Sequence, residues 1–94
     1  AVSWIEVRCR TTPSDEYPTF FFSLCKWLKG KELAEKTETK FYMVIQFTDG
    51  IFTSDETKTV REVGWGGRNQ MRDEYDKEPV VHIPIGELKK IWGI

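Results

Sequence analysis

A chain of 94 residues with 39% hydrophobic and 14% aromatic residues can build one small core, which predicts a single globular domain over residues 1–94 and excludes a disordered chain. Fourteen basic residues nearly balance 15 acidic ones, for a formal net charge of −1, so the basic excess typical of a dedicated nucleic-acid binder is missing. The sequence has no apolar segment of about 18 residues or more, and we therefore expect no membrane partner.

The two cysteines, Cys9 and Cys25, are too few for a disulfide framework. Both stand in apolar patterns, so we expect two reduced, buried thiols, with one disulfide as the alternative. Reduced thiols and a start without a signal-peptide pattern predict a cytoplasmic protein.

Residues 3–9, SWIEVRC, alternate between two faces and predict a half-buried strand. One face would carry Ile5, Val7 and Cys9, and the other would carry Trp4, Glu6 and Arg8. The next segment, residues 11–18 (TTPSDEYP), is a cluster of turn formers with two prolines and predicts a loop.

Residues 19–30, TFFFSLCKWLKG, carry two conflicting signals. A stripe of apolar residues at helical spacing is formed by Phe21, Leu24, Cys25 and Leu28. Thr19 would cap the start of this helix, and Gly30 would follow its last turn. Three consecutive phenylalanines instead favour a strand. We predict a helix near residues 18–29 and keep the strand as the alternative.

Residues 40–56 contain the clearest signal, which predicts a β-hairpin. Asp49 and Gly50 would form a two-residue turn, because glycine tolerates positive φ. That turn places Phe47 opposite Phe52. The first strand is apolar on both faces, so we expect it to be central in its sheet and covered on each side.

Two further sheet segments and a terminal turn complete the expected elements. Residues 57–65 and 79–85 predict strands, and Pro84 indicates an edge strand or the end of a strand because it lacks an N–H group. In residues 86–94, apolar side chains at helical spacing predict a short helical turn in which Trp92 plugs the core.

These elements predict an α+β fold with a mainly antiparallel sheet of four or five strands, one helix near residues 18–29 and a short C-terminal helical turn. The alternative is an all-β, SH3-like small barrel in which residues 19–27 form a strand. The expected core residues are Phe21, Leu24, Leu28, Ile45, Phe47, Val81, Ile83 and Trp92.

The residue inventory argues against several kinds of catalytic site. His82 is the only histidine, and with two cysteines it lacks the spacing of a zinc site. Neither cysteine stands in a nucleophile motif. The triplet Glu87-Leu88-Lys89 matches the end of a metal-nuclease motif, but such triplets arise by chance in a chain with 31% charged residues. We therefore predict a protein that is not an enzyme and has no cofactor and no bound metal.

The glycine-rich stretch of residues 64–79, GWGGRNQMRDEYDKEP, is the candidate binding segment. Its partner-binding residues would be Trp65, Arg68, Arg72 and Tyr75, because these residue types are frequent at interface hot spots. A solvated connector is the alternative. The sequence thus predicts a small protein that binds a protein partner as an adaptor, regulator or inhibitor, of the type that phages and mobile elements use; its oligomeric state stays open.

Nucleic acid is the alternative partner. Small β domains bind single strands with aromatic platforms and basic grooves. Side chains suited to this role are Tyr42, Arg61, Trp65, Arg68 and Arg72, and a second basic stretch comprises Lys26, Lys29 and Lys31.

Overall fold

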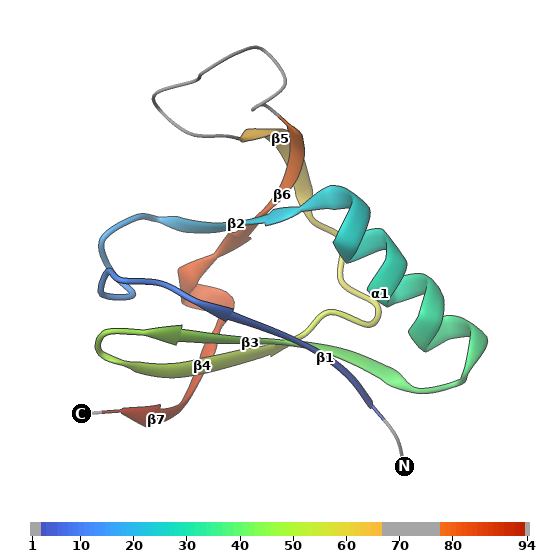
Figure 1. Cartoon of the computed structure of the whole chain (residues 1–94), viewed down its shortest axis with the longest axis horizontal. Coiled ribbons are helices and arrows are strands. Elements are labelled where there is room, and N and C mark those ends of the chain that lie inside the picture. The colour runs from blue at the N-terminus through green and yellow to red at the C-terminus, as the bar shows by residue number, and fades with distance from the viewer. Residues whose placement is uncertain (1–2, 67–77, 94) are drawn as a thin grey trace.

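Two β-sheets and one helix enclose the core of the computed structural model, which describes residues 3–66 and 78–93 (Figure 1). The strands are β1 (Ser3–Cys9), β2 (Thr19–Ser23), β3 (Lys40–Phe47), β4 (Gly50–Asp55), β5 (Glu62–Gly66), β6 (Glu78–Pro84) and β7 (Lys89–Gly93). The helix is α1 (Leu24–Lys36), and Ile85–Glu87 forms a 3₁₀ turn, η2. This arrangement confirms the predicted α+β class.

The first sheet has the strand order β1-β3-β4-β7, and the second has the order β2-β6-β5. In Figure 1 the second sheet lies above the first, with α1 beside both. Strand β1 pairs with β3 in parallel, whereas the other described pairs are antiparallel. A parallel pair needs a long crossover, and the crossover here consists of β2 and α1.

The predicted hairpin is present, but its turn lies one residue earlier than expected. Phe47 pairs with Gly50, which leaves Thr48 and Asp49 as the two loop residues. Gly50 has a φ of 150°, a conformation that glycine adopts without the steric cost a side chain would bring. Phe47 and Phe52 are diagonal neighbours on the inner face, with their ring centroids 5.5 Å apart.

The three phenylalanines form strand β2, and the helix begins only at Leu24. Phe20 and Phe22 are buried between the sheets, while Phe21 is 46% exposed on the opposite face. This alternation has the period of a strand. The expected cap at Thr19 and the expected end at Gly30 are therefore wrong, because α1 starts after the phenylalanines and continues past Gly30.

The end of the chain forms a strand where a helical turn was expected. The only turn in this region that the described residues show is η2, which precedes Leu88. Strand β7 then pairs with β4. Trp92 is 62% exposed and does not plug the core. Pro84 closes β6, which lies in the centre of its sheet, so the strand-end interpretation of this proline is the right one.

The core lies between the inner faces of the two sheets and the helix. Of the expected core residues, Ile45, Phe47, Val81 and Ile83 are buried. Leu24 is partly buried, whereas Phe21, Leu28 and Trp92 are exposed. The remaining buried apolar side chains are Phe20, Phe22, Trp27, Ala34, Phe41, Met43, Phe52, Val80 and Leu88.

Strand β3 is central in its sheet, as predicted, but only one of its faces is covered by described residues. Its outer face carries Tyr42, Val44 and Gln46, which are half-buried or exposed. Beside them Ile5 and Val7 of β1 are each 58% exposed. Within the described part of the chain, no helix has the length and apolar character needed to cross a membrane.

Candidate functional site

Four glutamates in the sequence stand two residues before a lysine or arginine. They begin the triplets Glu6-Val7-Arg8, Glu38-Thr39-Lys40, Glu56-Thr57-Lys58 and Glu87-Leu88-Lys89. An acid and a base at this spacing point to the same side only when the backbone is extended, because side chains alternate along a strand. The structure separates the four triplets by this criterion.

Three of the triplets lie where their two charges cannot work together. Glu38 lies in the turn after α1 and has a positive φ of 54°. Glu56 is fully buried and bound by Arg61, Ser54 and Trp27. Glu87 ends the turn η2 and forms an ion pair with Arg61. The triplet singled out from the sequence, Glu87-Leu88-Lys89, is therefore part of a structural network.

Glu6 and Arg8 lie on one face of strand β1 and form an ion pair of 2.7 Å. Their side chains are 33% and 30% exposed, respectively, so both are partly shielded yet accessible. The guanidinium of Arg8 also lies 5.1 Å from the centre of the Phe22 ring, a cation–π contact that restrains it. Glu6-Val7-Arg8 is thus the one acid–base pair of the four that is both oriented and open.

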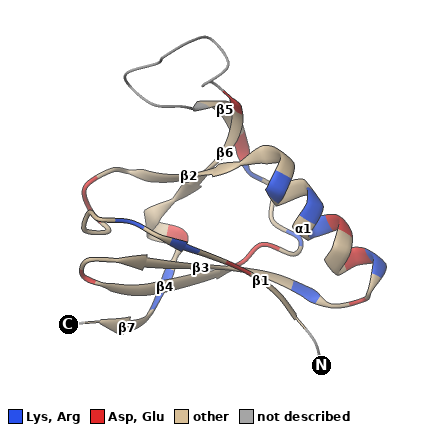
Figure 2. Ribbon diagram, viewed as in Figure 1, with Lys and Arg blue, Asp and Glu red and all other residues tan. Residues whose placement is uncertain are grey.

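A small pocket of about 180 Å³ lies between β1 and α1, and Glu6 lines it. Lys26 and Lys29 line the opposite side, on the first half of the helix. Both lysines are exposed. Figure 2 shows basic residues on β1 and on the neighbouring part of α1. Glu6 is therefore a single acid among cations, an arrangement suited to an anionic ligand that needs one general base or hydrogen-bond acceptor.

A divalent cation would need more ligands than this pocket offers. Mg²⁺ binds through carboxylates together with water and substrate phosphate oxygens. Within residues 3–66 and 78–93, no three His, Cys, Asp or Glu side chains gather in a way that could hold a metal ion. Glu6 is one carboxylate, and Arg8 already neutralises it. The described residues alone do not fit a metal site.

Of the four residues predicted to bind a partner, the structure describes only Trp65, and Trp65 does not line this pocket. Trp65 lies on β5, an edge strand of the second sheet, and is 73% exposed. Arg68, Arg72 and Tyr75 lie outside the described residues. Two side chains that suited nucleic-acid binding also lie elsewhere. Tyr42 lies on the outer face of the first sheet, and the Arg61 side chain is only 4% exposed.

The prediction of two buried thiols is wrong: Cys9 and Cys25 are free thiols but exposed, because both lie on solvent-facing positions of their elements. Of the basic stretch Lys26, Lys29 and Lys31, the first two line the pocket beside Glu6, whereas Lys31 packs on the Trp27 ring. Glu6 itself was assigned to a strand face but not to a site, and the signal that could have identified it was the acid–X–base spacing within a predicted strand.

Comparison with known proteins now adds to this geometry. Residues 1–91 match the family described as "Phage putative PDDEXK endonuclease". No curated protein and no solved structure matches the chain. The family match contradicts the prediction of a non-enzymatic adaptor, regulator or inhibitor, and with it the prediction that the chain is not an enzyme. Because the match spans nearly the whole sequence, the chain belongs to this phage PDDEXK endonuclease family.

Proposed function

We propose that this chain provides Glu6 and Arg8 to a nuclease site that hydrolyses phosphodiester bonds in nucleic acid. The observation that carries the proposal is the ion-paired, partly exposed Glu6-Val7-Arg8 triplet on one strand face. The last letters of the family name, E-X-K, describe an acid and a base at this same spacing. In the other three triplets the glutamate lies in a turn or forms hydrogen bonds and ion pairs that stabilise the fold.

The chain departs from the letters of the family name in two ways. Arginine stands at position 8 where the letters have lysine, and the sequence contains no Pro-Asp dipeptide to match the letters P-D. Arginine keeps the positive charge and adds a planar set of donors that suits phosphate oxygens. The missing Pro-Asp dipeptide leaves the family's other acid unassigned.

The chemistry expected of the pair follows from its charges. The carboxylate of Glu6 can accept a hydrogen bond from an attacking water molecule and orient it as a general base. The guanidinium of Arg8, held beside it, can donate to a phosphate oxygen and stabilise negative charge that develops there. Lys26 and Lys29 supply positive charge for the adjoining backbone of the substrate.

Trp65 extends the proposal to substrate binding outside the pocket. Its indole is 73% exposed, and an exposed aromatic ring suits stacking with a base. Nucleic acid replaces the protein partner that was expected for this residue.

The test is a cleavage assay with the purified protein on single-stranded and duplex DNA, with Mg²⁺ or Mn²⁺ and with EDTA. We expect Glu6→Gln to lower the cleavage rate by about 10²- to 10⁴-fold, the usual contribution of a general base. Glu35→Gln is the matched control, because Glu35 is an exposed glutamate on α1. We expect the control to cleave at the wild-type rate.

Substitutions at Arg8 test whether cleavage needs only its positive charge or also the planar set of donors of its guanidinium group. Arg8→Lys restores the letter of the family name and should keep most of the activity, whereas Arg8→Ala should lose it. A Glu6→Gln variant that cleaves normally, or a wild-type protein that cleaves neither DNA with either metal, would overturn the proposal.

A further inference from the structure

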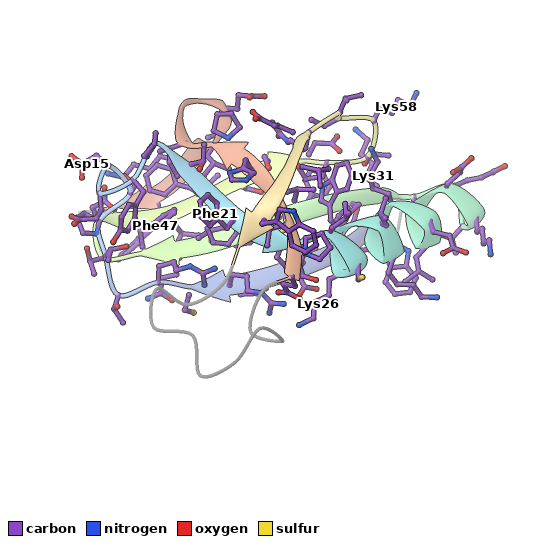
Figure 3. The ribbon with its side chains drawn as sticks, turned by 90° about the horizontal axis from the view of Figure 1, so that it is seen from above. Asp15, Phe21, Lys26, Lys31, Phe47 and Lys58 are labelled. Atoms are coloured by element: carbon purple, nitrogen blue, oxygen red, sulfur yellow. The ribbon has the colours of Figure 1, made fainter. Side chains whose placement is uncertain are left out.

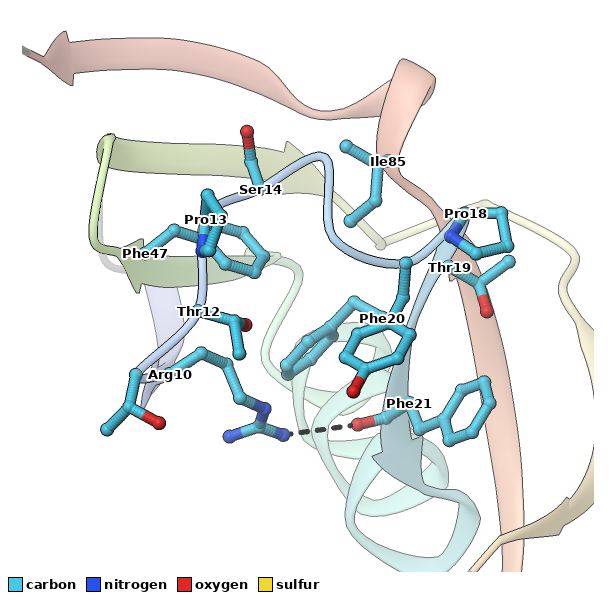
Figure 4. Close-up of a pocket in the computed structure, with 12 residues that line it drawn as sticks. Arg10, Thr12, Pro13, Ser14, Pro18, Thr19, Phe20, Phe21, Phe47 and Ile85 are labelled. Carbon is cyan, nitrogen blue, oxygen red and sulfur yellow. Dashed lines mark hydrogen bonds between the residues drawn. The ribbon is translucent and has the colours of Figure 1, made fainter.

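A larger pocket, of about 600 Å³, lies beyond the end of β1 (Figure 4). Its volume falls within the range of about 300–1,000 Å³ that is usual for small-molecule sites. It is lined by the β1–β2 loop, the start of β2, the end of β3 and the turn η2. Phe20 and Phe47, both buried, contribute apolar surface at its base, with their ring centroids 6.4 Å apart.

Hydrogen bonds fix the loop that forms one wall of this pocket. The Asp49 carboxylate accepts bonds from the backbone N–H and the hydroxyl of Ser14, at 2.9 Å and 2.6 Å. The N–H of Thr48 donates to the carbonyl of Thr12 at 3.1 Å, and the N–H of Ile85 donates to the carbonyl of Pro18 at 3.1 Å. Because both ends and the middle of the loop are tied to other elements, the pocket is formed before any ligand arrives.

Arg10 is the one charged residue that lines the pocket. Its guanidinium lies 4.4 Å from the centre of the Phe20 ring and donates to the carbonyl of Phe21 at 3.4 Å, the dashed line in Figure 4. Among the described residues, no carboxylate forms an ion pair with it. Its positive charge is therefore left for a ligand.

One aromatic side chain lines the pocket and still faces solvent. Tyr17 is 63% exposed. Phe21 reaches the pocket with its backbone carbonyl, whereas its ring lies on the opposite face of β2 against the ring of His82, with 4.4 Å between the ring centroids (Figure 4). An exposed ring beside an arginine that no described carboxylate neutralises is a combination that holds single-stranded nucleic acid, in which bases stack and phosphates meet positive charge.

We propose that this pocket holds an unpaired base of a single-stranded nucleic-acid substrate, stacked against Tyr17, with its phosphate against Arg10. The pocket chemistry stands on its own, but its role in placing a substrate strand for cleavage rests on the proposed nuclease function. A base inside a duplex has its faces and pairing edge occupied, so it enters such a pocket only when unpaired or flipped out.

The pocket continues the face that carries the candidate nuclease pair. Arg10 extends the strand, since its N–H donates to the carbonyl of Gln46 at 2.8 Å. Arg8 and Arg10 lie over Phe22 and Phe20, two residues apart on each strand. Arg10 follows Glu6 by four positions of extended chain, about 13 Å at the usual rise of 3.3 Å per residue. One substrate strand can therefore follow β1 from the pocket to Glu6.

The experiment measures binding apart from cleavage. The anisotropy of a labelled oligo-dT of about 12 nucleotides is titrated with protein in EDTA, which prevents any metal-dependent reaction. We expect Tyr17→Ala to weaken binding about 5- to 150-fold, the usual loss for one stacked base. Tyr17→Phe keeps the ring and should bind normally. Trp92→Ala is the matched control, because Trp92 is equally exposed but lies on β7.

The outcomes separate the two proposals. Weakened binding by Tyr17→Ala supports the pocket even if no DNA is cleaved. Cleavage that depends on Glu6 together with normal binding by Tyr17→Ala overturns the pocket and leaves the nuclease proposal standing. Equal affinity for an abasic oligonucleotide also overturns the pocket, because phosphate alone would then be bound. So does tighter binding of an aromatic peptide than of oligo-dT.

Discussion

At the scale of single residues, a glutamate's surroundings decide whether it serves the fold or remains free to react. Glu56 is fully buried, and it accepts hydrogen bonds from Arg61 at 2.8 Å and 2.6 Å, from Ser54 at 2.9 Å and from Trp27 at 3.2 Å. All its bonding capacity is used inside the molecule. Glu6, by contrast, is bound by Arg8 alone among described residues and lines a pocket. The sequence shows the same acid–X–base spacing for both and cannot separate them.

The pKa of Glu56 sets a limit to stability in acid. Burial raises this pKa, but the hydrogen bonds from Arg61 and Ser54, the charge of Arg61 and the bond from Trp27 outweigh it, so the pKa lies below the ordinary 4.5. A carboxyl whose pKa is lowered by folding contributes stability that is fully present above its unfolded pKa and is lost as the pH falls through its folded pKa. The stabilisation that Glu56 provides is therefore complete above about pH 4.5 and is lost progressively as the pH falls below it.

We predict that Glu56→Gln lowers the free energy of unfolding at pH 7 by about 3 kcal/mol, the low end of the cost of breaking a buried ion pair. The low end applies because Glu87 still pairs with Arg61, at 2.8 Å. Urea denaturation at pH 7 and at pH 3.5 measures the effect, and the difference between wild type and variant should shrink at the lower pH. Glu35→Gln, an exposed change, should alter stability by less than about 0.5 kcal/mol. A pH-independent loss would contradict the ion-pair explanation.

At the scale of elements, sequence patterns predicted the β-hairpin well and the helix poorly. The hairpin is determined locally, by alternation along β3 and by a glycine at its turn. The helix was misplaced because its buried stripe does not look apolar. Besides Leu24 at its start, the positions of α1 that lie against the core are Trp27, Gly30, Lys31 and Ala34. Lys31 belongs there because its amine lies 4.3 Å from the centre of the Trp27 ring and donates to the carbonyl of Thr59 at 2.5 Å.

The same limits applied to the candidate site. Alternation placed Glu6 and Arg8 on one strand face, and the structure agrees with that assignment. The pairing of this face with Lys26 and Lys29 depends on a crossover through β2 and α1, which no local pattern encodes. The expectation of a protein partner had no residue motif behind it, and the family match replaced it.

We predict that Gly30→Ala destabilises the protein even though alanine favours helices over glycine by about 1 kcal/mol. A Cβ atom at Gly30 would lie 2.6 Å from the Phe41 ring, so the helix would have to move away from β3. Overpacking of this kind costs about 1–3 kcal/mol. In a Phe41→Leu background the same change should cost less, because the two effects are coupled. Thermal unfolding of the four proteins measures the cycle, and a stabilised single variant would show that the ring can move aside.

At the scale of the whole molecule, a nearly neutral chain carries a basic face. Arg8 of β1 and Arg10, which follows it, lie over β2, and Lys26 and Lys29 lie on the neighbouring first half of α1 (Figure 2). About one-fifth of the chain separates the two pairs. Among the described acidic residues, Glu6 lies on this face, whereas others such as Asp49, Asp55 and Glu56 are engaged in hydrogen bonds or ion pairs elsewhere. Net charge therefore underestimates the attraction for a polyanion, because binding responds to the local field.

This face should govern how DNA binding responds to salt. Each phosphate contact on a single strand contributes about 0.7 to the slope of log affinity against log salt concentration. We predict that Lys26→Gln combined with Lys29→Gln lowers this slope by about 1.4 and weakens binding similarly for every base sequence. Lys58→Gln with Lys89→Gln removes the same charge from exposed positions outside the pocket, and Figure 3 places Lys26 and Lys58 on opposite sides of the molecule. Titrations of oligo-dT in EDTA over a range of salt concentrations measure both pairs. An equal change in slope for the two pairs would show that DNA responds to net charge, and the strand would then have no fixed path along β1 and α1.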